Sequence, residues 1–446
     1  MDVYEKFIEM KLAPKKGNGF KPIWIPGWLY GFQDILTRWT IELGRAATFA
    51  DCGLGKTPMS LVWAENIVRK TNKPVLIFTP LAVAPQFVRE GEKFGIKVHH
   101  SKDGKFIKGI NVANYQRLHY FNPKDFTALV CDESGCLKHH DSKTRQGVVD
   151  FSKDIQYILL GTATPAPNDF MELGNSAEVL GAMKYHHMLS TFFTHDSSDT
   201  GQWRLRGHAK NRFWRWVSSW ARAIRKPSDL GFDDGDFILP PLETQQYEVA
   251  STEPEFGLFR MEARTLAEQR QERRDTINAR CEKVVELVPK DRPFIAWCSL
   301  NDEGDLLEKL IPDAVQVKGS QSIDEKEEKL FAFSEGKIKN LISKPKIAGF
   351  GLNWQHCSDV SFFPLHSFEM YYQAIRRCYR FGQKRTVKLH LVTSEGESLV
   401  LSNMQRKEKQ AEELYNGIIR EMYNYQVGKS KGNHQTKEEV LVPSWL

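Results

Sequence analysis

The chain has 446 residues, of which 41% are hydrophobic, and this length and composition favour two domains, each with its own buried core. Lys and Arg outnumber Asp and Glu by only 62 to 56, so the overall charge does not itself indicate a polyanionic partner, which local basic patches would have to bind. Seven cysteines without a C-x-x-C pair argue against a disulfide framework, and no apolar run reaches the roughly eighteen residues that cross a bilayer, so we expect a soluble, cytoplasmic protein without signal peptide or membrane span.

A glycine-rich loop, Gly53-Leu54-Gly55-Lys56-Thr57, lies between an apolar run at residues 46–50 and a stretch with helical periodicity at residues 58–70. Glycines let backbone N–H groups turn toward phosphates, and the following helix points its positive end at them. Lys56 would then contact the β- and γ-phosphates of ATP, and the Thr57 hydroxyl would bind Mg²⁺. Ala50 stands where the usual pattern begins with glycine. A strand-to-helix turn that binds nothing is the alternative, which this flanking pattern disfavours.

Two adjacent carboxylates, Asp132 and Glu133, follow another predicted strand. Short apolar runs at residues 74–80, 109–113, 126–131 and 156–160 predict the strands of an α/β domain. Ligands of such sheets bind at the carboxyl ends of the strands. We therefore expect Asp132 to hold Mg²⁺ and Glu133 to deprotonate the water that attacks the γ-phosphate. An isolated Asp-Glu pair is usually a solvated turn, but the phosphate loop upstream reverses that preference.

Cys131, Cys136, His139 and His140 fall close together and offer a second interpretation of this segment as a zinc site. Cys131 ends the apolar strand, however, so its side chain is expected to pack inward. We therefore favour core packing over metal binding here.

The strand at residues 156–160 is followed by Gly161-Thr162-Ala163-Thr164-Pro165. The hydroxyl groups of Thr162 and Thr164 are suited to hydrogen bonds across a domain interface, which would couple the two domains. Without the other motifs, the segment is only a turn with favourable Ser/Thr chemistry.

Aromatic and basic residues alternate in the middle of the chain, at residues 192–226. Such a mixture can stack bases and contact phosphates, and Arg204, Arg206 and Arg212 are the candidate nucleic-acid ligands. Phe213, Trp216 and Trp220 have helical spacing, so packing of one helix face is the expected role of those three. Whether the arginines contact nucleic acid or the segment serves packing alone stays open at this point.

A Gly-, Asp- and Pro-rich stretch at residues 227–241 marks a boundary, and charged helical stretches follow at residues 256–288. A second alternation then predicts strands at residues 294–298, 314–317, 340–343, 360–363 and 387–392, with helices at 305–310 and 324–334. Arg377 and Arg380 are three residues apart, which places them on one face of an expected helix. From there they would clamp a γ-phosphate bound by the first half, unless they belong to a basic solvated face.

The motifs quoted so far resemble those of superfamily-two helicases, in particular the Swi/Snf-like branch of DNA translocases. The resemblance covers the chain from Gln33 to about Glu413. The loop at residues 53–57 resembles motif I, residues 132–135 with Leu137, Lys138, Ser142 and Lys143 resemble motif II and its continuation, and residues 161–165 with Asn168 resemble motif III. In the second half, residues 239–241 resemble the start of the second lobe, residues 318–320 one of that lobe's motifs, residues 349–353 motif V and residues 373–383 motif VI with the Gly-Gln ending of this branch.

The resemblance implies a DNA-dependent ATPase whose two RecA-like lobes close on ATP and Mg²⁺ and move along DNA, more plausibly duplex than single-stranded. It adds Gln33, which reads adenine in this family, Gly351 of motif V to the ATP site, and Gln373 of motif VI to the catalytic set. The compact architecture, without reader domains, is similar to enzymes of bacteria and their viruses.

The predicted fold is α/β, with two RecA-like lobes and a helical, aromatic-rich insertion between them. The expected divisions are an N-terminal extension (1–30), the ATP-binding lobe (31–190), the insertion and linker (191–290), the C-terminal lobe (291–426) and a tail (427–446). Gly135 departs from the family, which often has histidine there to link the ATP site to motif III. The alternatives are an RNA-directed helicase, which the Gly382-Gln383 ending disfavours, and a nucleic-acid-binding module with a decayed ATPase, which the intact ATP-site residues disfavour.

Overall fold

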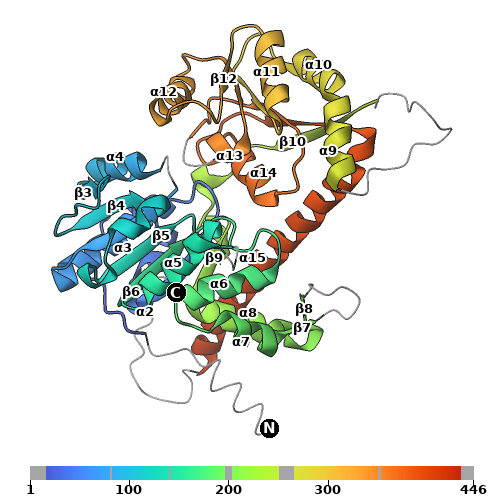
Figure 1. The fold of residues 1–446 in the computed structure, drawn as a ribbon. Coiled ribbons are helices and arrows are strands. Elements are labelled where there is room, and N and C mark those ends of the chain that lie inside the picture. The colour runs from blue at the N-terminus through green and yellow to red at the C-terminus, as the bar shows by residue number, and fades with distance from the viewer. Residues whose placement is uncertain are drawn as a thin grey trace.

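The computed structural model describes residues 17–80, 83–138, 140, 142–195, 203–250, 266–349 and 353–432, and within them it has two parallel β-sheets flanked by helices (Figure 1). The expected α/β fold of two RecA-like lobes is thereby confirmed. In Figure 1 the first lobe is blue to green and the second is yellow to orange.

The first lobe is built on a seven-stranded sheet with the order β3-β4-β2-β5-β6-β1-β9. Its strands are β1 Arg45–Ala50, β2 Val75–Thr79, β3 Val98–His100, β4 Ile110–Asn114, β5 Ala128–Asp132, β6 Tyr157–Gly161 and β9 Ala221–Ile224. β2, β4, β5 and β6 are fully buried, which is why they read as continuous apolar runs in the sequence. Every strand pair is parallel, so the polar clusters after β1, β5 and β6 meet at one edge.

Helices cover both faces of this sheet. They are α2 Gly31–Leu43, α3 Lys56–Thr71, α4 Ala84–Phe94, α5 Lys143–Ser152, α6 Leu173–Val179, α7 Tyr185–Phe192 and α8 Lys210–Trp220. One apolar core lies under α3 and α4 and includes Trp63, Ile67 and Phe87. The other lies under α5, α6 and α8.

The aromatic middle segment is part of the first lobe's second core. Phe213, Trp216 and Trp220 of α8 are buried there, which confirms the expected packing of one helix face. β9 follows α8 directly and pairs with β1, so this segment also supplies an edge strand of the first sheet. β7 Phe193–His195 and β8 Trp203–Leu205 form a small antiparallel pair beside it. The domain boundaries drawn from the sequence stay predictions.

The second lobe has a six-stranded sheet with the order β10-β15-β14-β11-β13-β12. Its strands are β10 Leu242–Val249, β11 Phe294–Trp297, β12 Ala314–Val317, β13 Asn340–Ser343, β14 Asp359–Phe362 and β15 Val387–Ser394. Its helices are α9 Leu266–Asp275, α10 Ile277–Leu287, α11 Asn301–Leu310, α12 Ile323–Ser334, α13 Pro345–Ala348 and α14 Phe368–Ile375. The strands and helices expected in residues 294–392 are confirmed, with shifts of a few residues at their ends.

A single long helix, α15 Ser398–Gly432, belongs to both lobes and crosses Figure 1 as the red diagonal. Near its start, Leu401 and Met404 pack in the core of the second lobe. Further along, Leu414, Ile418 and Met422 pack in the core of the first lobe beside α8. The two sheets are therefore tied together by side chains of one helix.

Candidate nucleotide-binding site

The glycine-rich loop has the backbone conformation of a phosphate cradle. Gly53 and Gly55 have φ angles of +90° and +80°, a region that side chains other than glycine rarely occupy. Gly55 caps the N-terminus of α3, which begins at Lys56. The loop therefore joins a buried strand to the positive end of a helix, as predicted from the sequence.

This loop lines a cavity of about 290 Å³ between the lobes. The Lys56 ammonium donates to the carbonyl of Ala50, 3.0 Å away, and so folds back along the loop. Residues of both lobes complete the cavity; they include Gln33, Thr57, Glu90, Asp132, Glu133, Asn353, Arg377, Arg380 and Phe381. The structure thus brings the expected ATP-site residues together, except Leu54, which belongs to the loop but does not line the cavity, and Gly351, which lies outside the described residues.

Asp132 and Glu133 stand at the carboxyl end of β5, facing the loop. Burial, reinforced by the charge of Glu133, raises the pKa of Asp132 to about 8. A divalent cation at this carboxylate would favour its charged form, and the Thr57 hydroxyl lines the same cavity. Asp132 and Thr57 therefore fit a magnesium ion.

Glu133 is held by contacts from both lobes. Its φ of +48° is unusual for a residue with a side chain. Its carboxylate accepts from the Thr162 hydroxyl at 3.3 Å and from the Gln373 amide at 3.5 Å. Gln373 comes from α14 of the second lobe, so the candidate base is positioned by a residue that lies 240 positions away in the sequence.

Arg377 and Arg380 both line the cavity. The sequence predicted that they lie on one face of a helix, and this prediction is wrong. α14 ends at Ile375, and both arginines follow in turns. At the end of the helix the backbone hydrogen bonds shift to residues three positions back: Arg377 N donates to the Ala374 carbonyl at 3.2 Å, and Cys378 N donates to the Ile375 carbonyl at 3.0 Å.

The two arginines nevertheless line the same cavity, Arg377 buried and Arg380 half-buried. The Arg377 guanidinium donates to the Gln373 side-chain oxygen at 2.9 Å. The amide of the same Gln373 side chain donates to Glu133, so Gln373 connects the arginine to the candidate base. Burial, with a further contribution from Arg377, lowers the pKa of Arg380 to about 10. Two guanidinium groups that line one cavity, that of Arg377 being buried, create a site that favours an anion.

Gln33 lies beside the phosphate loop, and both ends of its amide contact backbone. Its nitrogen donates to the Leu54 carbonyl at 3.0 Å, and its oxygen accepts from Tyr30 N at 3.2 Å. Tyr30, Phe237 and Phe381 line the same end of the cavity, where the rings of Phe237 and Phe381 stack with centroids 4.6 Å apart. This end suits a flat base, although the role of Gln33 in reading adenine stays a prediction.

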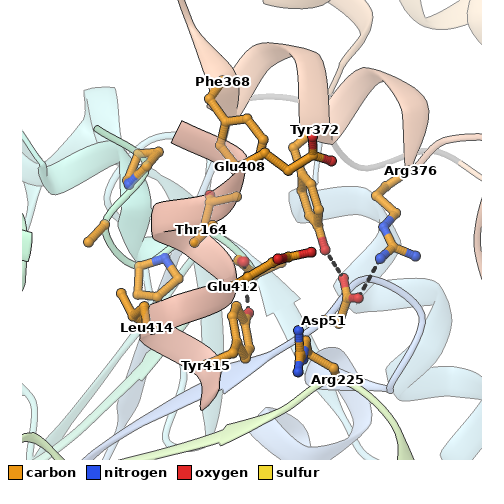
Figure 2. Close-up of a pocket in the computed structure, with 15 residues that line it drawn as sticks. Asp51, Thr164, Arg225, Phe368, Tyr372, Arg376, Glu408, Glu412, Leu414 and Tyr415 are labelled. Atoms are coloured by element: carbon orange, nitrogen blue, oxygen red, sulfur yellow. Dashed lines mark hydrogen bonds and ion pairs between the residues drawn. The ribbon is translucent and has the colours of Figure 1, made fainter. Parts of the chain in front are cut away.

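Sequence reasoning missed a contact between the lobes at the base of the phosphate loop. The Asp51 carboxylate accepts from the Arg376 guanidinium at 2.6 Å and from the Tyr372 hydroxyl, and both partners belong to the second lobe (Figure 2). Asp51 and Arg376 are largely buried, with side chains 7% and 15% exposed. Opposite charges at residues 51 and 376 were visible in the sequence, but no local pattern pairs them.

In the segment after β6, the hydroxyls expected to bond across the domain interface do not do so: the Thr162 hydroxyl bonds within the first lobe, and the Thr164 hydroxyl has no hydrogen-bond partner among the described residues. Besides contacting Glu133, the Thr162 hydroxyl accepts from Thr164 N at 3.0 Å. Ala163 accepts from the Tyr415 hydroxyl of α15 at 2.8 Å. Figure 2 shows Thr164, Tyr415 and the Asp51 contacts around a second inter-lobe cavity of about 170 Å³. This segment therefore contacts the candidate base and the long helix.

The candidate nucleic-acid ligands lie in the segment that leads from β8 into α8. Arg204 is on β8, Arg206 follows that strand, and Arg212 is in the first turn of α8. Arg204 and Arg212 are exposed. Arg204 lines a groove of about 390 Å³ together with Trp203, Lys210, Arg406 and other residues. None of the three arginines contacts the nucleotide cavity, so their role stays a prediction.

Cys131 is fully buried in β5, which agrees with its expected packing in the core. His139, part of the zinc interpretation, lies outside the described residues. Within the described part of the chain, no cluster of three or more His, Cys, Asp and Glu side chains could hold a metal. In that same part, no helix combines the length and the apolar character needed to span a bilayer.

No protein-family model matches the sequence, and no curated protein matches it. Among solved structures, the chain is similar to the Sulfolobus solfataricus SWI2/SNF2 ATPase core in complex with dsDNA. The sequences are 17% identical, the match covers 89% of this chain and 98% of that chain, and the TM-score is 0.42. A likeness of this degree does not assign a function to this chain.

Proposed function

We propose that this protein is a DNA-stimulated ATPase that converts ATP hydrolysis into movement along DNA. The observation that supports this most is the composition of one cavity. The first lobe contributes the phosphate loop and the two carboxylates to this cavity, and the second lobe contributes Arg377 and Arg380. Residues that act on one nucleotide are thus contributed by two separate sheets, so hydrolysis and the relative position of the lobes depend on each other.

Each residue has a distinct task in this proposal. Lys56 and the loop amides bind phosphates, while Thr57 and Asp132 hold Mg²⁺, which supplies charge neutralisation at the phosphates when bound. Glu133 takes a proton from the attacking water. Arg377 and Arg380 stabilise the negative charge that develops on the γ-phosphate.

DNA is proposed as the polymer because the motifs resemble the Swi/Snf-like branch, including the ending Gly382-Gln383. The exposed arginines near β8 and α8 are the proposed contacts to its phosphates. RNA remains the competing polymer, since phosphate contacts alone do not distinguish the two.

The deciding experiment compares steady-state ATP hydrolysis without nucleic acid and with single-stranded DNA, duplex DNA or RNA. We expect the largest stimulation by duplex DNA. No hydrolysis under any of the four conditions would reject the ATPase, whereas stimulation by RNA alone would reject DNA as the polymer.

A further inference from the structure

The helix α14 of the second lobe contacts the segment around Asp132 and Glu133 at two points. Glu369 and Gln373 are four residues apart, so they lie on the same helix face. Gln373 donates to Glu133, and Glu369 accepts from the Lys138 ammonium of the first lobe. The candidate base Glu133 and Lys138 are five positions apart in one segment. One face of α14 therefore contacts both ends of this segment.

The Lys138–Glu369 pair is shielded from water. The two side chains are 12% and 9% exposed. The backbone at Lys138 is fixed as well, because its carbonyl accepts from the Asn175 amide of α6 at 2.6 Å. Removing one charge of such a pair leaves the other buried without its partner, which makes the contact sensitive to substitution.

Because Gly135 has no side chain, the Glu369 carboxylate can approach the backbone of the first lobe at this residue. A β-carbon at this position would lie 2.9 Å from the Thr164 carbonyl oxygen and 3.0 Å from a Glu369 carboxylate oxygen. The first distance is to backbone, which cannot rotate away. The histidine that related motor proteins often carry here would not fit this arrangement, so glycine leaves the space that Glu369 occupies.

We propose that the Lys138–Glu369 ion pair, with Gly135 as the space that admits it, links closure of the second lobe to the placement of Gln373 and Arg377 against Glu133. The pair is a positioning device, since neither member reaches the nucleotide cavity. This inference rests on the proposed ATPase function. It assigns the coupling of the lobes to an ion pair between them.

The test combines Glu369→Gln, which removes one charge at constant shape, with the reversals Lys138→Glu and Glu369→Lys and their double variant. We expect each single change to lower kcat by about tenfold or more, with the KM for ATP changed less than threefold, and the double variant to recover most of the loss. Lys153→Ala is the matched control, because it breaks a Lys–Asp pair on the surface of the same lobe. Thermal unfolding establishes that each variant is folded.

Hydrogen exchange with a non-hydrolysable ATP analogue gives a readout that does not depend on turnover. In the wild type the analogue should protect residues 368–375 and 132–138 together, whereas Glu369→Gln should lose this joint protection while the phosphate loop stays protected. Normal kcat in the single variants, no recovery in the double variant, or unchanged joint protection in Glu369→Gln would each overturn the inference while leaving the ATPase intact. Absence of hydrolysis in the wild type would instead reject the proposed function, and the inference with it.

Discussion

Lys56 and Glu133 line one cavity but act at different stages of the proposed reaction. Lys56 contacts phosphates in the bound ground state, so Lys56→Ala should abolish tight ATP binding and turnover. Glu133 acts only on the attacking water, so Glu133→Gln should bind ATP with wild-type affinity and fail to hydrolyse it. Equilibrium binding of a fluorescent ATP analogue and steady-state turnover check both variants. Near wild-type turnover by Glu133→Gln would remove this residue as the base.

Arg377 and Arg380 are predicted to act mainly on the transition state. Replacing either by alanine should lower turnover by about 10³-fold or more and change ATP affinity only several-fold, because arginines that meet a γ-phosphate are worth roughly 10³ to 10⁵ in rate. Arg385→Ala is a suitable control, since its exposed guanidinium bonds the His356 carbonyl outside the cavity. An arginine whose loss leaves turnover normal belongs to another site.

Single residues also show where prediction from the sequence stops. Lys56, Asp132 and Glu133 were identifiable because each follows a buried strand in a local pattern, and parallel strands deliver such clusters to one edge. Asp51 and Arg376 were missed, since their ion pair joins residues 325 positions apart and neither belongs to a pattern that names the other. The sequence showed that Gly135 departs from the histidine common in the family it resembles. The reason for glycine at this position could not be predicted, because it depends on Glu369, a side chain from the other lobe.

Among secondary-structure elements, the buried strands were predictable, whereas of the four edge strands of the two large sheets only β12 was predicted. β10 was missed because it lies at a sheet edge and carries mostly exposed polar residues, so it has no apolar run. β9 was assigned to an insertion because its four residues follow a helix and give no local signal of their partner β1. The arginines after α14 were placed on a helix because spacing alone does not reveal where the helix ends.

The segment from β8 to α8 is predicted to contact the phosphates of nucleic acid. Replacing Arg204, Arg206 and Arg212 together by alanine should weaken DNA stimulation and make the salt dependence of DNA binding shallower, by up to about 0.9 in slope for each lost phosphate contact. Binding titrations at several salt concentrations measure this slope. An unchanged slope together with unchanged stimulation would leave these arginines with no part in DNA binding.

The helix α15 should stabilise the first lobe although it follows the second in sequence. Ile418 is fully buried in the core of the first lobe, so Ile418→Ala should lower the free energy of unfolding by about 2 to 5 kcal/mol. Lys409→Ala, an exposed change on the same helix, is the control and should have an effect within about 0.5 kcal/mol. Urea unfolding followed by tryptophan fluorescence, to which the buried Trp214 beside Gly417 contributes, reports on this lobe. Equal stability of the two variants would contradict the docking of α15.

For the whole molecule, we predict movement along duplex DNA with little strand separation. Opening a fork needs a wedge, and the sequence of the second half shows no evident strand-turn-strand insertion between its motifs. Backbone contacts suffice for tracking, because phosphates carry no sequence information. Displacement of a third strand from a triplex measures translocation, and a forked duplex measures unwinding in the same preparation. Efficient fork unwinding without triplex displacement would make the protein a conventional helicase.

The path of α15 limits how two such lobes can move. Its 35 residues form a rod about 50 Å long, with apolar side chains fixed in the second lobe near one end and in the first lobe beyond the middle. Pulling the lobes straight apart would have to extract one set of these side chains from its core, at high cost. In the proposed motor, ATP hydrolysis would therefore have to change the orientation of the lobes while both sets of anchoring side chains stay buried.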